Sequence, residues 1–284
     1  MRGPFKYIGY CKLIFCTLYI YNIIHYKGEK HMPQHSLSRT ELLIGMDSLN
    51  KLQQSKVVVF GIGGVGSYTV EALVRAGVGK LVLIDDDTIC LTNLNRQIHA
   101  TFKTIGKSKV LVMKDRILEI NPKCEVITHE TFVTADNMGD IITEDTDYVV
   151  DAIDTVTSKI ALVEYCREHS INIICCLGTG NKLDPTLFRV ADIYDTKVCP
   201  LAKVMRHELR KRNVDALKVV YSEEIPIRPK LDEVITCKEG CVCTGGSKKC
   251  AMKRQIPGSI SFVPPVAGMI IGGEVIKDLI KDKN

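Results

Sequence analysis

Short apolar runs alternate with amphipathic segments along most of this chain. The apolar runs show little polar alternation, which is typical of parallel strands that are covered on both faces. They predict strands at residues 57–60, 81–84, 125–128, 148–154 and 171–177, with a further strand-like segment at 260–263. The pattern therefore predicts an α/β fold with a Rossmann-like, doubly wound and mostly parallel sheet.

Apolar positions with a helical period lie between and around these runs. They predict helices at residues 38–54, 72–76, 107–119, 158–169, 197–212 and 265–279. In the first helix, Leu42, Leu43, Met46, Leu49 and Leu52 are expected on one apolar face, as are Leu201, Val204, Met205 and Leu209 in the fifth. Small residues of the last helix, Ala267, Gly268, Gly272 and Gly273, are expected to let it pack closely on the sheet.

The turn after the first predicted strand is rich in glycine. Residues 61–67 read GIGGVGS between the strand and the following helix. Glycine permits positive φ and lets a nucleotide come so close that main-chain N–H groups hold its phosphates. The pattern predicts a nucleotide-binding turn made by Gly61, Gly63, Gly64, Gly66 and Ser67.

Acidic residues follow the second predicted strand. Asp85 stands about 20 residues beyond the glycine turn, where an acid usually holds a ribose hydroxyl. Asp87 lies beside it and is a second candidate. Taken alone, this combination favours NAD or FAD over ATP.

Amides and cations beyond these acids change the interpretation. Asn93, Arg96 and Gln97 come first, followed by Lys107 and Lys109. Hydride transfer develops no triphosphate charge, whereas cleavage of ATP needs cations that stabilise the charge spreading over the phosphates. We therefore predict an enzyme that uses ATP to adenylate a carboxylate. The alternative is that these cations lie on a solvated helix face.

Asp154 ends the predicted strand at 148–154. Ligands of open α/β sheets lie beyond the carboxyl ends of the strands, so Asp85, Asp87 and Asp154 are expected to share one crevice. Mg²⁺ bound to ATP needs oxygen ligands, and Asp154 is the predicted one. Asp154 is also a candidate N-cap of the helix at 158–169, and the two roles are compatible.

Composition agrees with a globular intracellular enzyme. The apolar fraction of 45% is ample for a buried core, and 284 residues permit one large α/β domain or two small ones. The net charge of +5 is compatible with an RNA substrate without requiring one. The 12 cysteines are spread through a nucleotide-binding pattern, so we expect reduced thiols in the cytoplasm.

Residues 1–31 differ from the rest of the chain. Their apolar stretch is interrupted by Lys12, Asn22 and His25, and no signal-peptide cleavage site follows it. We expect an N-terminal extension upstream of a natural start at Met32, with residues 32–284 forming a single domain and no membrane association. A membrane anchor is the alternative.

Two later segments allow more than one interpretation. In the helix at 197–212, the cations Lys203, Arg206, His207, Arg210, Lys211 and Arg212 could follow a nucleic-acid backbone or lie on a solvated face. The irregular loop at 223–255 contains Cys237, Cys241, Cys243 and Cys250. Four thiols could hold Zn²⁺, although their spacing is not paired CxxC, and free or redox-active cysteines are the alternative.

From Ser38 onward the chain resembles the ThiF/MoeB-type adenylating enzymes, which are relatives of the ubiquitin-activating enzymes. Within that family it is most similar to the tRNA threonylcarbamoyladenosine dehydratases. The resemblance rests on residues 38–42, 61–67, 93–99, 151–154, 184–186 and 257–279. It does not extend to the zinc site of some relatives, which depends on two CxxC pairs that this chain lacks.

The resemblance implies roles for individual residues. Gly63, Gly64, Gly66 and Asp85 would bind adenosine and phosphates, Asn93, Arg96 and Lys109 would grip the triphosphate, and Asp154 would bind Mg²⁺. Arg39 stands on the first turn of a helix, where a cation is unfavourable to the helix dipole. The resemblance implies that it reaches the ATP site of a neighbouring subunit in a homodimer; an exposed surface arginine is the alternative.

The activity implied is ATP-dependent cyclisation, a dehydration, of threonylcarbamoyladenosine in tRNA through an acyl-adenylate. A monovalent cation is a further candidate cofactor, and a cysteine desulfurase or sulfur acceptor a further candidate partner. Two alternatives stay open. One is adenylation of the C-terminal Gly-Gly of a small sulfur-carrier protein, with Cys243 as a sulfur or thioester relay. The other is a nicotinamide-dependent oxidoreductase or a nucleotide sensor without catalysis.

Overall fold

The computed structural model describes residues 34–230 and 257–281. The chain divides into two compact units, Met1–Ser38 and Arg39–Asn284. In the described part of the first unit, the main-chain N–H of His35 donates to Ser38 Oγ at 2.8 Å. The predicted N-terminal extension at 1–31 and the four cysteines between 237 and 250 lie outside the described residues.

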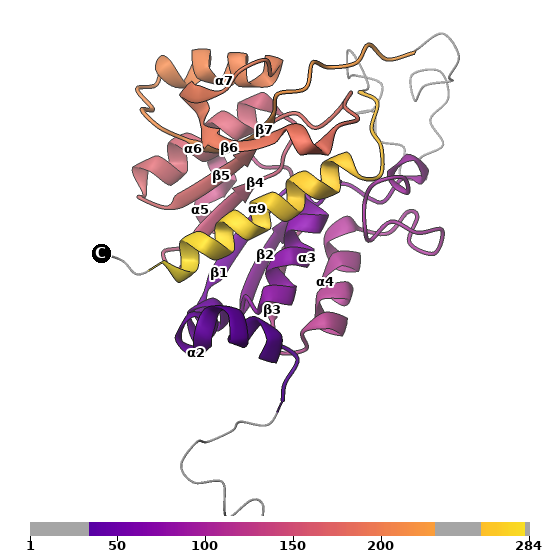
Figure 1. The fold of residues 1–284 in the computed structure, drawn as a ribbon, viewed down its shortest axis with the longest axis vertical. Helices are drawn as coiled ribbons and strands as arrows, with labels where there is room; N and C mark the ends of the chain where they lie inside the picture. The colour runs from indigo at the N-terminus through magenta and orange to yellow at the C-terminus, as the bar shows by residue number, and fades with distance from the viewer. Residues whose placement is uncertain (1–33, 231–256, 282–284) are drawn as a thin grey trace, which may run out of the picture. The chain divides into compact units, whose positions relative to one another are not determined.

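One seven-stranded sheet organises the second unit (Figure 1). Its strands lie side by side in the order β3-β2-β1-β4-β5-β7-β6, and every neighbouring pair is parallel except β6 and β7. The predicted Rossmann-like, mostly parallel sheet is thus confirmed. The strands are β1 (Lys56–Phe60), β2 (Lys80–Ile84), β3 (Glu125–His129), β4 (Tyr148–Asp151), β5 (Asn172–Cys176), β6 (Phe188–Asp192) and β7 (Lys218–Ser222).

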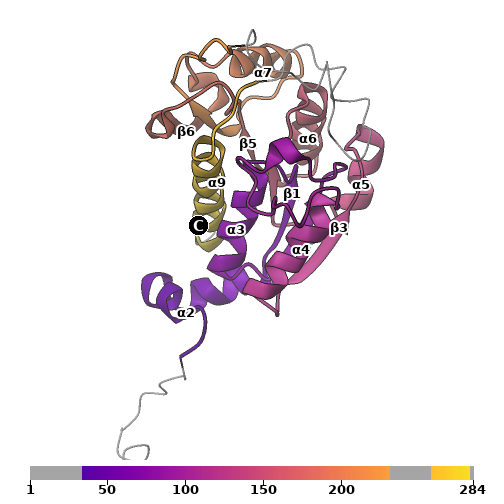
Figure 2. The same ribbon diagram turned by 90° about the vertical axis from the view of Figure 1, so that its right-hand side faces the viewer.

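Helices cover both faces of this sheet (Figure 2). Three helices, α3 (Gly66–Ala76), α4 (Lys109–Ile120) and α9 (Val263–Ile280), share one core, while α5 (Met138–Ile141) and α6 (Val156–Glu168) cover the other face. The remaining helices are α2 (Ser38–Gln54) and α7 (Pro200–Arg210), with short 3₁₀ turns η1 (Leu91–Asn93), η2 (Ala135–Asn137), η3 (Pro185–Leu187) and η4 (Ile193–Asp195). No helix within the described ranges is long and apolar enough to span a bilayer.

Successive strand residues enter different cores, as the period of a β-strand requires. In β1, Val57 and Val59 pack with α3 and α9, whereas Val58 and Phe60 pack with α5 and α6. All five residues of β1 are buried. This double coverage explains why the strand appears in the sequence as an unbroken apolar run.

The last helix contacts another helix closely, in addition to the sheet. A methyl group on Gly268 would lie 2.4 Å from the carbonyl oxygen of Val65, and one on Gly272 would lie 2.5 Å from Ala72 Cβ. Both neighbours belong to the start and body of α3, so these two glycines set how closely α9 approaches it. Gly273 has no neighbour within 4 Å and does not contribute to this packing.

Several predicted elements differ from the structure. The strand expected at 260–263 is absent from these described residues, because a turn at 261–262 leads directly into α9. The fourth strand ends at Asp151, before Asp154. Strands β6 and β7 were not predicted.

Two predicted helix faces are only partly correct. Gly45 takes φ 79° and kinks α2, so Leu42 and Leu43, on the N-terminal side of the kink, are 89% and 85% exposed. Only Leu49 and Leu52 of the expected α2 face are buried. In α7, Val204 is 47% exposed, while Met205 and Leu209 enter the core as predicted.

Candidate functional site

A cavity of about 900 Å³ lies at the carboxyl ends of β1, β2, β4 and β5. The strand order reverses between β1 and β4, and this switch point is where open α/β sheets bind ligands. The expected common crevice is present, because Asp85, Asp87 and Asp154 all line this cavity. Its wall also includes the glycine turn after β1, residues around η1, Lys109, and segments 176–182, 199–201 and 257–259.

The glycines of the turn after β1 have different structural roles. Gly61 has φ 87°, and a methyl group there would lie 2.7 Å from the carbonyl oxygen of Ala152. A methyl group on Gly66 would collide with the carbonyl oxygen of Gly61 at 1.8 Å. Gly61 and Gly66 are therefore required by the fold itself.

Gly63 and Gly64 face the cavity. A methyl group on Gly63 would have Gln97 Nε2 as its nearest neighbour, 3.9 Å away, so the main chain here is open to a ligand. Helix α3 begins at Gly66 without a side-chain cap at its N-terminus. A helix N-terminus of this kind favours anions, and phosphate oxygens match it.

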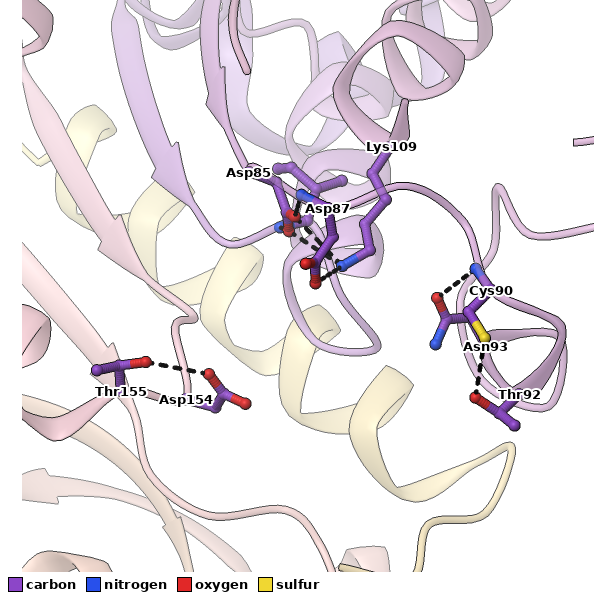
Figure 3. A network of polar contacts seen from close by, with 9 residues as sticks. Asp85, Asp87, Cys90, Thr92, Asn93, Lys109, Asp154 and Thr155 are labelled. Atoms are coloured by element: carbon purple, nitrogen blue, oxygen red, sulfur yellow. Dashed lines mark hydrogen bonds and ion pairs between the residues drawn. The ribbon is translucent and has the colours of Figure 1, made fainter. Parts of the chain in front are cut away.

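A largely buried carboxylate, Asp85, lies against this turn (Figure 3). The Asp85 carboxylate accepts hydrogen bonds from the main-chain N–H groups of Ile62, at 2.7 Å, and Asp87, at 2.9 Å. These bonds join the tip of β2 to the glycine turn. Asp85 thereby fixes the position of the turn, whatever else it binds.

Lys109 reaches the same carboxylate from the start of α4. Its Nζ lies 3.2 Å from Asp85 Oδ1 and 2.8 Å from Asp87 Oδ2, and its side chain is 7% exposed (Figure 3). Burial alone would lower the pKa of Lys109, but the two carboxylates outweigh it and raise that pKa. Lys109 therefore presents an ammonium cation at the cavity wall.

Arg96 is the second cation at this wall. Its Nη1 donates to the carbonyl oxygen of Thr92 at 3.0 Å and to Asn95 Oδ1 at 2.9 Å. Burial lowers the pKa of Arg96, which nevertheless stays protonated. In the described part of the chain, no carboxylate pairs with Arg96, so its charge is available to an anionic ligand.

Two amides accompany Arg96. Asn93 Oδ1 accepts from the main-chain N–H of Cys90 at 3.0 Å and thus shapes the start of η1 (Figure 3). Gln97 is buried, lines the cavity, and has no partner for Oε1 among the described residues. An unsatisfied buried acceptor costs about 1–3 kcal/mol, which a ligand donor would recover.

Asp154 lies at the opposite wall, in the loop after β4. It is exposed, and its Oδ1 accepts from Thr155 Oγ1 at 3.4 Å (Figure 3). The prediction that Asp154 caps the following helix is wrong, because α6 begins at Val156 and its N-cap is Thr155. The Asp154 carboxylate is instead presented to the cavity.

The model of the ThiF family matches residues 37–284. The chain belongs to that family. The tRNA threonylcarbamoyladenosine dehydratase of Bacillus subtilis is 43% identical over 249 residues, which cover 87% of this chain and 96% of that protein. The dehydratase of the same name from Haemophilus influenzae is 39% identical over 246 residues, covering 84% and 90%.

A solved structure agrees with these relatives. The crystal structure of Escherichia coli TcdA, a tRNA N6-threonylcarbamoyladenosine dehydratase, in complex with ATP has a TM-score of 0.74 and 33% identity. The match covers 86% of this chain and 93% of that one. The resemblance stated from sequence motifs is thereby confirmed.

Some predicted site residues of this ThiF-family chain lie away from the cavity. Ser67 is fully buried, and its Oγ accepts from the main-chain N–H of Ile98 at 3.5 Å. Lys107 is exposed and does not line the cavity. Arg39 is exposed on the first turn of α2, and its contribution to a neighbouring subunit stays a prediction.

The far wall of the cavity contains Asn181 and Lys182, two residues for which the sequence predicted no individual role. Lys182 is 5% exposed, and its Nζ donates to the carbonyl oxygen of Glu224 at 2.7 Å. Asn181 accepts from the main-chain N–H of Gly258 at 2.6 Å through Oδ1 and from that of Ile227 at 2.8 Å through its carbonyl oxygen. The sequence did not indicate that Lys182 is buried, because its hydrogen-bond partner is the main-chain carbonyl of a residue far away in the sequence.

Proposed function

We propose that this chain is an ATP-dependent tRNA threonylcarbamoyladenosine dehydratase. The observation that carries the proposal is the cavity in which Arg96, without a carboxylate partner among the described residues, faces the glycine turn alongside Lys109. Two cations there suit a triphosphate better than a hydride-transferring dinucleotide. Relatives of nearly equal length carry this dehydratase name, and the E. coli structure contains ATP.

The proposed reaction takes place in two steps. The threonyl carboxylate of the modified adenosine attacks the α-phosphorus of ATP, and pyrophosphate leaves to give an acyl-adenylate. The ureido group of the same nucleoside then attacks the activated carbonyl, loses a proton, closes a five-membered ring and releases AMP. The nucleoside has lost one water overall. No nucleophilic cysteine is needed, because the attacking group is held intramolecularly at high effective molarity.

The cavity residues divide this work. Main-chain N–H groups near Gly63 and Gly64 would hold phosphates, while Arg96 and Lys109 would stabilise charge on the departing pyrophosphate. A carboxylate offers about four lone-pair sites. Each oxygen of Asp85 accepts one main-chain N–H, from Ile62 or Asp87, and one contact from Lys109 Nζ, at 3.2 Å for Oδ1 and 3.5 Å for Oδ2. A ribose hydroxyl would take the place of the longer Lys109 contact.

Asp154 fits the role of a Mg²⁺ ligand. It is an exposed carboxylate on the cavity wall, and hard cations prefer oxygen ligands. When bound, Mg²⁺ would neutralise charge on the phosphates. Asp154, which follows β4, is the residue of this wall that would hold the ion.

We also propose a cytoplasmic homodimer in which Arg39 serves the partner's cavity. The exposed Leu42 and Leu43 beside Arg39 supply an apolar surface for such a contact. Mixing inactive Arg39→Ala and Arg96→Ala subunits tests this directly. One intact cavity per heterodimer should restore activity, whereas no recovery in a verified mixed dimer would contradict the shared site.

The function itself is tested by ATP–pyrophosphate exchange. We expect exchange with tRNA that carries threonylcarbamoyladenosine and none with the same tRNA lacking the modification. Exchange that instead requires a sulfur-carrier protein ending in Gly-Gly would select that alternative. Tight NAD binding without ATP binding would select an oxidoreductase.

A further inference from the structure

We propose that three cations of α7, Lys203, Arg206 and Arg210, form a docking ridge for the phosphate backbone of the tRNA. The inference rests on the proposed function, since it takes the substrate to be an RNA. The proposal says which part of this chain binds the tRNA outside the modified nucleoside.

The three side chains of the ridge lie along one side of α7. Residues three and four apart on a helix have Cβ atoms about 5–6 Å apart, and Lys203, Arg206 and Arg210 follow that spacing. The rise of an α-helix makes the ridge about 10 Å long. Ala202, Met205 and Leu209 bury the neighbouring side of α7, whereas Lys203 and Arg210 are exposed and Arg206 is half-buried at the edge between the two sides.

The pattern of ion pairs separates the ridge from the other cations of this segment. Lys211 Nζ lies 3.0 Å from Glu208 Oε1, and Arg212 Nη1 lies 2.8 Å from Glu208 Oε2. Arg212 Nε also lies 3.4 Å from Glu164 Oε2, so Lys211 and Arg212 each have a carboxylate partner inside the protein. His207 Nε2 is 3.9 Å from Glu208 Oε1, a contact that is an ion pair only when the imidazole is protonated.

The ridge has no such compensation within residues 34–230 and 257–281. Arg206 Nη1 donates to the carbonyl oxygen of Thr196 at 3.1 Å, and the Arg210 guanidinium lies 5.1 Å from the centre of the Tyr194 ring. Both contacts hold the side chain in place and leave its charge uncancelled. Asp215 lines a small depression together with Arg210, and no ion pair of 4 Å or less joins the two side chains.

The ridge begins next to the candidate active site. Cys199, the N-cap of α7, and the first helical residues Pro200 and Leu201 line the cavity, and α7 continues from there into the ridge (Figure 1). A nucleoside inserted into the cavity carries its flanking phosphates past this helix. Cations without carboxylate partners, spaced along one side of a helix, are suited to bind a row of phosphates. On a helix face that is only solvated, there is no such reason for them to lack carboxylate partners.

The test compares two variants that each remove two positive charges. Lys203→Gln/Arg210→Gln removes exposed ridge cations, and Lys211→Gln/Lys277→Gln removes exposed lysines that are paired with Glu208 and Glu274. Binding of an unmodified tRNA transcript is measured by fluorescence anisotropy at KCl concentrations from about 50 to about 200 mM. Protein–phosphate contacts weaken strongly over this range of salt. Equal urea midpoints establish that both variants fold.

We expect the ridge variant to bind tRNA about tenfold or more weakly, with the slope of log K against log salt reduced by roughly two. The control should stay within about twofold of the unsubstituted chain, and ATP affinity should be unchanged in both. An unchanged affinity and slope for the ridge variant would overturn the docking proposal, as would an equal loss in the control.

The two proposals fail separately. Intact tRNA-dependent exchange in a ridge variant with normal tRNA affinity would leave the proposed function standing and remove the ridge. Absence of exchange with modified tRNA in the unsubstituted chain would remove the proposed function. If the ridge variant binds tRNA normally but binds an acidic protein more weakly than the control does, the ridge serves a protein partner and the RNA assignment is wrong.

Discussion

The ammonium of Lys159 lies 2.9 Å from the carboxylate of Asp151, and both side chains are almost fully buried. Lys159 Nζ also donates to the carbonyl oxygen of Cys176 at 2.7 Å, while Asp151 Oδ1 accepts from the main-chain N–H of Ile153 at 3.1 Å. The pair therefore joins the ends of β4 and β5 to α6. It also sets the direction of the loop that carries Asp154 into the cavity.

Breaking this pair on one side should be more damaging than removing both charges. Lys159→Met leaves the Asp151 carboxylate buried without its cation, a change that typically costs about 3–5 kcal/mol. In the double variant Lys159→Met/Asp151→Asn no charge is left buried, so part of that loss should be recovered. Urea unfolding measures both. Equal destabilisation of the single and double variants would show that the charge balance is unimportant here.

Arg96 should be essential for the chemical step. Arg96→Ala removes a cation without leaving a buried carboxylate unpaired, so the fold should persist while exchange falls at least about 100-fold. Lys107→Ala is the matched control, because Lys107 is exposed and lies outside the cavity lining. Its exchange rate should stay within about twofold. A near-normal rate for Arg96→Ala would remove this residue from the mechanism.

The two kinds of glycine in the turn should respond differently to alanine. Gly66→Ala forces a methyl group to within 1.8 Å of the Gly61 carbonyl oxygen, so we expect it to destabilise the fold by about 2 kcal/mol or more. Gly63→Ala meets no atom closer than 3.9 Å and should fold normally. Its methyl group instead stands where phosphates would approach, so calorimetry should show weaker ATP binding. Unaltered ATP affinity in Gly63→Ala would place the phosphates elsewhere.

The sequence predicted those parts of the structure whose signal is local. The buried parallel strands, the glycine turn and Asp85 follow from short patterns, and the structure places Asp85 against Lys109. Strand β6 was not predicted because it is the antiparallel edge strand, in which Arg189 and Asp192 interrupt the apolar residues and leave no long apolar run. Strand β7 lies between β5 and β6 and is buried, but its apolar run covers only residues 219–221.

Contacts that depend on distant partners could not be predicted in this way. From the sequence, Lys159 would be predicted as a solvent-exposed helix residue. It is buried only because α6 places it against the ends of β4 and β5. The kink at Gly45 likewise depends on a single residue with φ 79°, and it reverses the expected burial of Leu42 and Leu43. In each case packing in three dimensions overrides the helical period.

His99 should make the fold sensitive to acid. It is 3% exposed, and neither ring nitrogen has a partner among the described residues. Burial, with help from the nearby cations Lys109 and Arg116, lowers the pKa of His99 from 6.5 to about 3. Between these values the unfolded chain binds a proton that the folded chain excludes, so stability falls as pH drops below 6.5.

The effect can be isolated by comparing the chain with His99→Leu, which cannot titrate at this position. Relative to that variant, the unsubstituted chain should lose about 1.4 kcal/mol of unfolding free energy between pH 7.5 and 5.5, and about 2.7 kcal/mol by pH 4.5. Urea unfolding at each pH gives the two curves. Because other titrating groups are common to both proteins, only their difference reports His99. Parallel curves over this range would mean that His99 takes up its proton equally in the folded and unfolded states, and that its buried position is open to water.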